Sequence, residues 1–155
     1  QSVHSLLLRN TFYGKNVISF HRGKEVKYFH VQFGLPLKSI DHVDTEYDAI
    51  IHPIDFKNVY MKKKPLRSVT DVIRNKGIIL EIKCKFLNRD CRGSQWNRHL
   101  VESKHTKVIY VCNHADIITS VEKKNIDDYF KKLRSMGHNI HIIHQNSMLI
   151  NAICS

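Results

Sequence analysis

The chain of 155 residues contains no uninterrupted run of about 18 apolar residues, the length that a helix needs to cross a bilayer. Its first eight residues, QSVHSLLL, are too short and too weakly basic to predict a secretory signal peptide. No tandem repeat or low-complexity linker divides the sequence. We therefore expect one soluble domain over residues 1–155 without a membrane span, and the 42% hydrophobic content is sufficient for a core.

Cysteine is scarce, and its four positions are unevenly spaced: Cys84, Cys91, Cys112 and Cys154. Three of them fall in or beside predicted strands, where a free thiol behaves as a small hydrophobic side chain. We therefore expect a reducing intracellular compartment, without distinguishing cytoplasm, nucleus or organelle matrix. Two of the cysteines precede His99 and His105 in a C-x6-C-x7-H-x5-H pattern. Its cysteine spacing is wider than the two to four residues of most structural zinc sites, which disfavours zinc.

Acidic residues are also few, because 14 Asp and Glu stand against 25 Lys and Arg, for a net charge of +11. A charge of this size attracts phosphate polymers, since each phosphate that is neutralised releases condensed counterions. RNA or DNA is therefore the expected partner, and an acidic protein or anionic lipid is the alternative. The protein could also belong to a larger assembly with other proteins.

The N-terminal part of the sequence favours β-structure. Residues 16–20 and 26–33 are rich in Val, Ile, Phe and Tyr, and residues 21–25 between them have the composition of a turn. This pattern predicts an N-terminal β-hairpin whose second strand ends at Gly34-Leu35-Pro36. A short apolar run over residues 47–52, ending before Pro53, predicts a buried strand.

Further along, helical and strand patterns alternate. Helices are predicted over residues 68–75, from Ser94, and from Asn125 to a stop at Gly137. Each precedes an apolar strand, at residues 78–86, 107–112 and 139–144. Because parallel strands require crossover connections, three such steps predict an α/β three-layer sandwich with a largely parallel central sheet.

Two basic segments are candidate nucleic-acid contacts. Exposed lysines and arginines neutralise phosphates, and a nearby aromatic ring stacks on unpaired bases, as in proteins that bind single strands. The first segment is loop-like, and the second follows the predicted strand at residues 78–86, at an end where α/β sheets bind ligands. The candidates are Lys57, Tyr60, Lys62, Lys63, Lys64 and Arg67 in the first segment, and Lys85, Arg89, Arg92 and Arg98 in the second.

One pattern suggests catalysis. Residues 78–83, IILEIK, place E-x-K on an apolar strand downstream of Asp48 and of Pro53-Ile54-Asp55, and this arrangement resembles the PD-(D/E)xK nucleases. The resemblance implies that Asp48 or Asp55, together with Glu81, holds a divalent metal such as Mg²⁺, and that Lys83 positions water or stabilises charge. Alternation along a strand puts Glu81 and Lys83 on one face, as this chemistry requires. The proline precedes Asp55 by two residues instead of one, which departs from the family pattern.

Residues 43–83 also resemble the later part of a Rossmann-type methyltransferase, where a strand like YDAII precedes a helix and a strand like NKGIILEIK. The glycine-rich loop that would hold the methyl donor is missing, and His52-Pro53 replaces the polar catalytic signature. The resemblance therefore implies a degenerate methyltransferase-like platform for RNA rather than an active enzyme.

The sequence thus leads to two principal hypotheses. The first is a basic α/β domain that binds nucleic acid, with RNA favoured, without catalysis or a required cofactor, as part of a ribonucleoprotein or replication assembly. The second is a metal-dependent nuclease. They differ in geometry, because only the nuclease requires an aspartate to lie beside Glu81.

Overall fold

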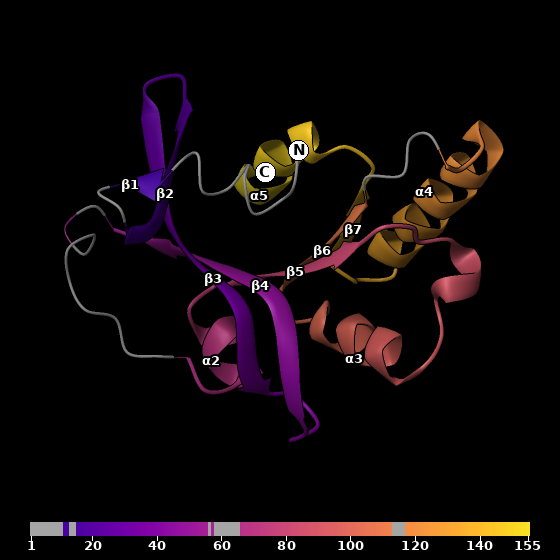
Figure 1. The fold of residues 1–155 in the computed structure, drawn as a ribbon, viewed down its shortest axis with the longest axis horizontal. Helices are drawn as coiled ribbons and strands as arrows, with labels where there is room; N and C mark the ends of the chain where they lie inside the picture. The colour runs from indigo at the N-terminus through magenta and orange to yellow at the C-terminus, as the bar shows by residue number, and fades with distance from the viewer. Residues whose placement is uncertain (1–10, 13–14, 56, 58–65, 113–116) are drawn as a thin grey trace.

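The computed structural model describes residues 11–12, 15–55, 57, 66–112 and 117–155. It contains one curled mixed sheet whose strands follow chain order from β1 to β7 (Figure 1). The two-residue strand β1 (Thr11–Phe12) precedes six longer strands, which are β2 (Lys15–Arg22), β3 (Glu25–Lys38), β4 (Asp44–Ile54), β5 (Ile78–Lys83), β6 (Lys107–Cys112) and β7 (Ile140–Ile143).

The prediction of a largely parallel three-layer sandwich is wrong. Every pairing from β1 to β5 is antiparallel, and only β5 with β6 and β6 with β7 are parallel. The error lies in the connection from β4 to β5. This connection contains the helix α2 (Val69–Arg74). It nevertheless leaves β4 and enters β5 at the same end of the two strands, because Ile51 of β4 pairs with Ile78 at the start of β5 in an antiparallel ladder. A helix between two strands therefore did not imply a crossover here.

The N-terminal hairpin is present, with β2 and β3 joined at Gly23, whose φ of 63° suits a tight turn. The expected break at Gly34-Leu35-Pro36 is wrong, because β3 continues to Lys38. Instead Gly34 adopts a φ of 55° inside the strand. At that point the side chains change faces, since Phe33 packs with one hydrophobic cluster and Leu35 with the other.

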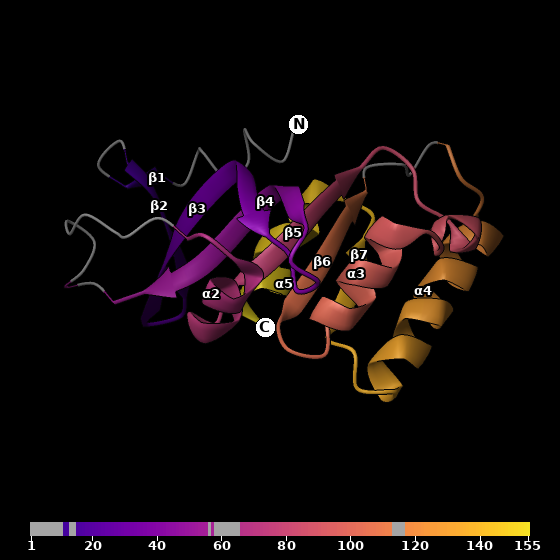
Figure 2. The same ribbon diagram turned by 90° about the horizontal axis from the view of Figure 1, so that it is seen from below.

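Three helices cover one face of the sheet, where β5 to β7 run parallel (Figure 2). They are α2, α3 (Ser94–Glu102) and α4 (Ser120–Ser135). Helix α4 begins earlier than the predicted Asn125, because Thr119 and Glu122 form a capping box that satisfies the first amides. The short helix α5 (Leu149–Cys154) packs on the other face (Figure 1). No described helix is long and apolar enough to span a membrane.

Alternation along the central strands supplies two cores. Ile78, Leu80 and Ile109 point toward α5, whereas Ile79 and Tyr110 point toward α2, α3 and α4. All four cysteines carry free thiols, two of them buried in these cores. The acidic residue Glu81 follows the same alternation and lies on the face covered by α3, where it is only 4% exposed.

Candidate active site

Asp48 of β4 lies beside Glu81 of β5. The antiparallel ladder between β4 and β5 has Ala49 opposite Leu80 as its last pair, and the same register continued by one residue sets Asp48 opposite Glu81. The ladder stops at this point, because Asp48 Oδ2 accepts a hydrogen bond of 2.8 Å from the backbone N–H of Ile82. A side chain thus replaces the main-chain partner where the two strands separate.

The kink of β3 at Gly34 lies beside this separation. Gly34, Glu46, Asp48 and Ile82 line a cavity of about 340 Å³ that reaches the half-buried Asp48 carboxylate. A Cβ atom at Gly34 would lie 3.4 Å from Glu46 Oε1, and the positive φ would be strained for any other residue. The backbone conformation therefore favours glycine at this position of the lining.

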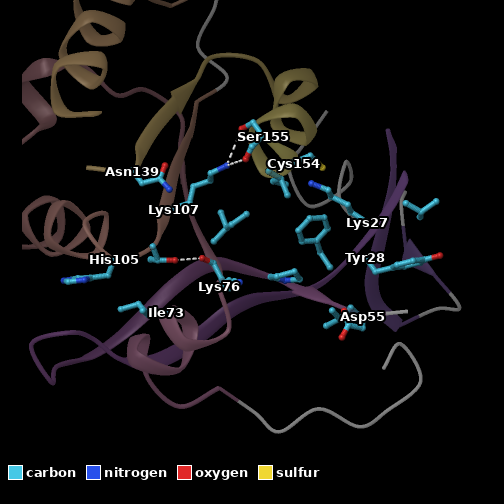
Figure 3. Close-up of a pocket in the computed structure, with 18 residues that line it drawn as sticks. Lys27, Tyr28, Asp55, Ile73, Lys76, His105, Lys107, Asn139, Cys154 and Ser155 are labelled. Atoms are coloured by element: carbon cyan, nitrogen blue, oxygen red, sulfur yellow. Dashed lines mark hydrogen bonds between the residues drawn. The ribbon is translucent and has the colours of Figure 1, made fainter. Parts of the chain in front are cut away.

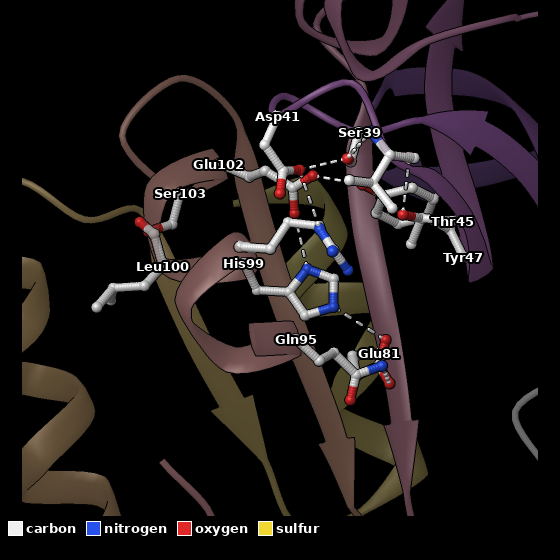
Figure 4. A network of polar contacts seen from close by, with 12 residues as sticks. Ser39, Asp41, Thr45, Tyr47, Glu81, Gln95, His99, Leu100, Glu102 and Ser103 are labelled. Carbon is white, nitrogen blue, oxygen red and sulfur yellow. Dashed lines mark hydrogen bonds and ion pairs between the residues drawn. The ribbon is translucent and has the colours of Figure 1, made fainter. Parts of the chain in front are cut away.

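Glu81 is held by three side chains, Lys83 of β5 and Gln95 and His99 of α3, of which Figure 4 shows the last two. Gln95 Nε2 of α3 donates to Glu81 Oε1 over 3.3 Å, and Lys83 Nζ lies 3.4 Å from the same oxygen. Lys83 Nζ also donates to Gln95 Oε1 over 3.2 Å, which closes a triangle. On the other side, His99 Nε2 lies 3.2 Å from Glu81 Oε2.

The contacts of Glu81 continue into the protein through His99. His99 Nδ1 lies 2.8 Å from Glu102 Oε1, and the Tyr47 hydroxyl donates to Glu102 Oε2 over 2.5 Å. His99 is 2% exposed and Glu102 is fully buried. Burial opposes protonation of His99, but the hydrogen bonds and charges of Glu102 and Glu81 outweigh it and raise its pKa to about 9. A buried imidazolium therefore bridges two carboxylates at neutral pH.

The two carboxyl groups that face each other have opposite pKa shifts. The pKa of Asp48 is raised by burial and by the adjacent Glu81 carboxylate, although the Ile82 amide opposes the shift. Burial also acts to raise the pKa of Glu81, but the hydrogen bond and charge of His99, with the charge of Lys83, hold it below its ordinary value. A pair of carboxylates that repel each other in this way is stabilised by a cation placed between them.

Asp55, the other aspartate that the E-x-K pattern allows, does not reach Glu81. It lies just beyond the C-terminal end of β4, seven residues from Asp48, which corresponds to about 23 Å of extended strand. It is exposed and borders a different cavity. Lys57 and Arg67 are also exposed, Lys57 just after that same end of β4. The predicted contacts Tyr60, Lys62, Lys63 and Lys64 lie outside the described residues.

The second basic segment lies near the candidate site. Lys85, Arg89 and Arg92 are exposed after the end of β5. Arg98 differs from them, because its side chain is 14% exposed and its Nε donates to Asp41 Oδ1 over 3.3 Å. Asp41 also accepts a hydrogen bond from Ser39. Arg98 therefore holds the loop between β3 and β4, and three of the four predicted contacts remain open to a ligand.

Sequence reasoning missed Gln95 and Glu102, and it considered His99 only as a ligand in the zinc pattern. Their signal was present, since Gln95 and His99 are four residues apart and Glu102 follows three later, so all three lie on one helix face. That face turns a histidine and a glutamate toward an apolar sheet. The helical spacing could thus have indicated a buried His99–Glu102 pair, but not that His99 also contacts Glu81.

Among the described residues, no group of three or more His, Cys, Asp or Glu side chains is placed to hold a metal ion. His99, one of the four residues of the disfavoured zinc pattern, is engaged by Glu81 and Glu102. Two carboxylates nevertheless fit Mg²⁺, which commonly takes one or two protein carboxylates and completes its shell with waters and substrate phosphates.

Comparison with known proteins matched no protein family, no curated protein and no solved structure. The antiparallel pairing of β4 with β5 also differs from the parallel sheet expected of a Rossmann-type methyltransferase. Function must therefore be inferred from the geometry of the site.

Proposed function

We propose that this protein is a divalent-metal-dependent nuclease with Asp48, Glu81 and Lys83 in its active site. The observation that carries the proposal is the position of Asp48 beside Glu81, at the point where β4 and β5 separate. The two hypotheses raised by the sequence differ on this contact, because a binding domain without catalysis has no need to set two carboxylates against each other in its interior. The resemblance to the PD-(D/E)xK pattern gives these residues their roles.

Asp48 and Glu81 would hold the metal ion through carboxylate oxygens. Mg²⁺ bound there would stabilise negative charge on the phosphoryl oxygens and lower the pKa of a coordinated water. The hard oxygen donors and the unfavourable Asp48–Glu81 interaction both suit such an ion. His99 keeps Glu81 ionised and fixes the orientation of its carboxylate.

Lys83 would supply a positive charge beside the metal-binding carboxylates. Its side chain is 32% exposed, so the ammonium reaches solvent while it is held by Glu81 and Gln95. An ammonium in that position can orient a water molecule for attack or stabilise charge on a phosphate oxygen. Gln95 holds both Glu81 and Lys83, and it therefore acts as a positioning residue.

The net charge of +11 supports RNA or DNA as the substrate, because it favours association with a phosphate polymer. Exposed Lys85, Arg89 and Arg92 follow the strand that carries Glu81 and Lys83, so a bound strand would meet cations next to the carboxylates. Binding without catalysis, the other hypothesis, explains the charge but leaves the carboxylate pair unexplained.

The proposal is tested by incubating labelled single- and double-stranded RNA and DNA with the protein and either Mg²⁺, Mn²⁺ or EDTA. We expect cleavage with metal only, abolished in Glu81→Gln and reduced at least a hundredfold in Lys83→Ala. Binding in EDTA should be nearly unchanged in Glu81→Gln, since the basic surface is retained.

A second readout does not depend on activity. Mg²⁺ should raise the melting temperature of the wild-type protein, because an ion that binds only the folded state stabilises it. The same addition should leave the melting temperature of Glu81→Gln unchanged. Cleavage that survives in Glu81→Gln, or binding without any metal-dependent cleavage, would refute the nuclease and leave a binding protein.

A further inference from the structure

A second cavity is lined by Lys83 and Gln95, the two residues that contact Glu81 Oε1 in the candidate active site. Its volume is about 210 Å³, and its lining comes from the end of β5, the following loop, α3 and β6. The lining residues are Lys83, Lys85, Phe86, Asp90, Arg92, Gln95, Trp96 and Tyr110. By position it would receive the part of a substrate next to the cleaved bond.

Positive charge dominates the lining. Lys83, Lys85 and Arg92 contribute three cations against the single acid Asp90. Asp90 is already engaged, because its Oδ2 accepts a hydrogen bond of 2.8 Å from the backbone N–H of Leu87. An anion in the cavity would therefore meet a local excess of cations.

Tyr110 provides an independent indication of a ligand. It is 1% exposed and pairs in register with Glu81, so its ring lies on the same face as the carboxylate. Its hydroxyl has no hydrogen-bond partner among the described residues, although the residue lines the cavity. The hydroxyl is not fully enclosed, because it is not among the buried polar atoms that lack a partner, so it can meet a group in the cavity. A ligand oxygen in the cavity would satisfy it.

The start of α3 adds further donors. Gly93 caps the helix without a side-chain hydrogen bond, and the first intrahelical bond runs from Asn97 N to Gly93 O. The backbone N–H groups of residues 94–96 therefore have no partner within the helix. Two of these residues, Gln95 and Trp96, line the cavity. Free amides at a helix N-terminus favour an anion.

The aromatic residues of the lining exclude a stacked base. Phe86 and Trp96 are 3% and 4% exposed, and their ring centroids lie 5.6 Å apart in a cluster with Tyr110 and Phe130. Their faces are thus occupied by each other. The volume corresponds to about seven water molecules at roughly 30 Å³ each, which suits a phosphate group better than a nucleotide.

We propose that this cavity binds a phosphate group of the nucleic acid strand, next to the phosphate that Asp48 and Glu81 would address. The inference rests on the proposed nuclease function for the identity of the ligand. Lys85 and Arg92 neutralise the phosphate, Tyr110 donates its hydroxyl, and Lys83 lies between the two phosphates. A strand held in this way is fixed in register relative to the carboxylates.

The chain offers a direct probe, because Trp96 is its only tryptophan and lines the cavity. Its fluorescence is titrated with thymidine 3′,5′-bisphosphate in EDTA, so that neither metal nor cleavage is involved. We expect a saturable change in the wild type and in Glu81→Gln. The dissociation constant should rise about tenfold in Arg92→Gln and about fivefold in Tyr110→Phe.

Arg74→Gln is the matched control, because Arg74 is an exposed arginine on α2 and does not line the cavity. Its dissociation constant should equal that of the wild type. The absence of a saturable change in the wild type, or an equal effect of Arg74→Gln and Arg92→Gln, would overturn the phosphate site. Since these measurements need no cleavage, they stand or fall separately from the nuclease.

Cleavage of matched oligonucleotides distinguishes the two sources of the phosphate. If the cavity holds a terminal phosphate, Arg92→Gln should slow cleavage of 5′-phosphorylated strands only. If it holds an internal phosphate, the variant should slow cleavage of 5′-phosphorylated and 5′-hydroxyl strands equally. If cleavage of both is unchanged while Glu81→Gln is inactive, the nuclease stands and the phosphate site is rejected.

Discussion

Asp48 and Asp55 lie beyond opposite ends of the ladder between β4 and β5, and they differ in what surrounds them. Asp48 is half-buried, bonded to the Ile82 amide and adjacent to the Glu81 carboxylate. Asp55 is exposed at the rim of a cavity of about 630 Å³, three times the volume of the cavity proposed to hold a phosphate (Figure 3). The E-x-K pattern in the sequence made Asp48 and Asp55 equal candidates for a metal ligand.

In the larger cavity at the Asp55 end, two polar side chains of the lining bond to backbone carbonyls. Lys107 Nζ donates to the carbonyl oxygens of Ala152 and Ser155 over 2.8 and 2.9 Å, and Thr106 donates to the Gly77 carbonyl. These two polar side chains of the lining are thus satisfied within the protein. We therefore place the proposed site by its opposed carboxylates and by the unpartnered Tyr110 hydroxyl, and not by cavity volume.

The sharpest way to break this comparison is to remove each aspartate in turn. Asp48→Asn should reduce metal-dependent cleavage by about a thousandfold, because it removes one of two charged metal ligands. Asp55→Asn should leave the rate within about twofold of the wild type. Cleavage rates at saturating Mg²⁺ measure both. Equal losses in the two variants would mean that the metal site is not at the Asp48 end.

The next prediction concerns stability, because only the Asp48 end depends on buried charges. His99→Gln leaves Glu81 and Glu102 without their shared cation, and breaking a buried ion pair costs about 3 kcal/mol or more. Chemical denaturation in EDTA at pH 6 measures the loss. Asp55→Asn, the control just beyond the C-terminal end of β4, should change the free energy of unfolding by less than about 0.5 kcal/mol.

The same network sets a pH dependence with a definite sign. The pKa of His99 is raised from 6.5 to about 9, so the folded state binds the extra proton between these values. The stability that it contributes is complete below about pH 6.5 and is lost as the pH rises through 9. The lowered pKa of Glu81 also makes the folded state lose stability as the pH falls below the ordinary value of 4.5. In His99→Gln the free energy of unfolding should no longer fall between pH 6.5 and 9. If it still falls, a group other than His99 is responsible.

The smallest expected effect concerns the basic residues at the two ends. Lys85→Gln with Arg92→Gln removes two cations beside the carboxylates, and Lys57→Gln with Lys76→Gln removes two on the Asp55 side, where Lys76 lines the same cavity as Asp55. Each lost phosphate contact lowers the slope of log affinity against log salt by about 0.7 to 0.9. We expect a decrease of about 1.5 in the first double variant and less than about 0.5 in the second. A larger decrease in slope in the second double variant would mean that the nucleic acid binds at the Asp55 end.

Part of the fold and site was accessible from the sequence, because it depends on local patterns. The period-two runs gave the hairpin and the central strands, and they put Glu81 and Lys83 on one face of β5. The net charge indicated a polyanionic partner, which stays a prediction. The capping box at Thr119 was equally local, yet it was overlooked in favour of Asn125.

Local patterns did not determine strand direction. The segment from Asp55 to Gly77 contains a helix, and a helix precedes both parallel and antiparallel strands. The direction of β5 relative to β4 depends on where that segment re-enters the sheet, which long-range packing of α2 against Ile79 and Tyr47 decides. The predicted parallel sheet failed for this reason.

The sequence by itself determined that this protein is strongly basic, rich in short strands and equipped with an E-x-K strand, because charge and side-chain alternation are properties of the chain alone. Only the tertiary structure decided which aspartate meets Glu81, and that Gln95 and His99 of α3 hold it. The physical reason is that these contacts join residues 14 to 34 positions apart. Their distances are set by strand register and helix packing, neither of which leaves a short-range trace in the sequence.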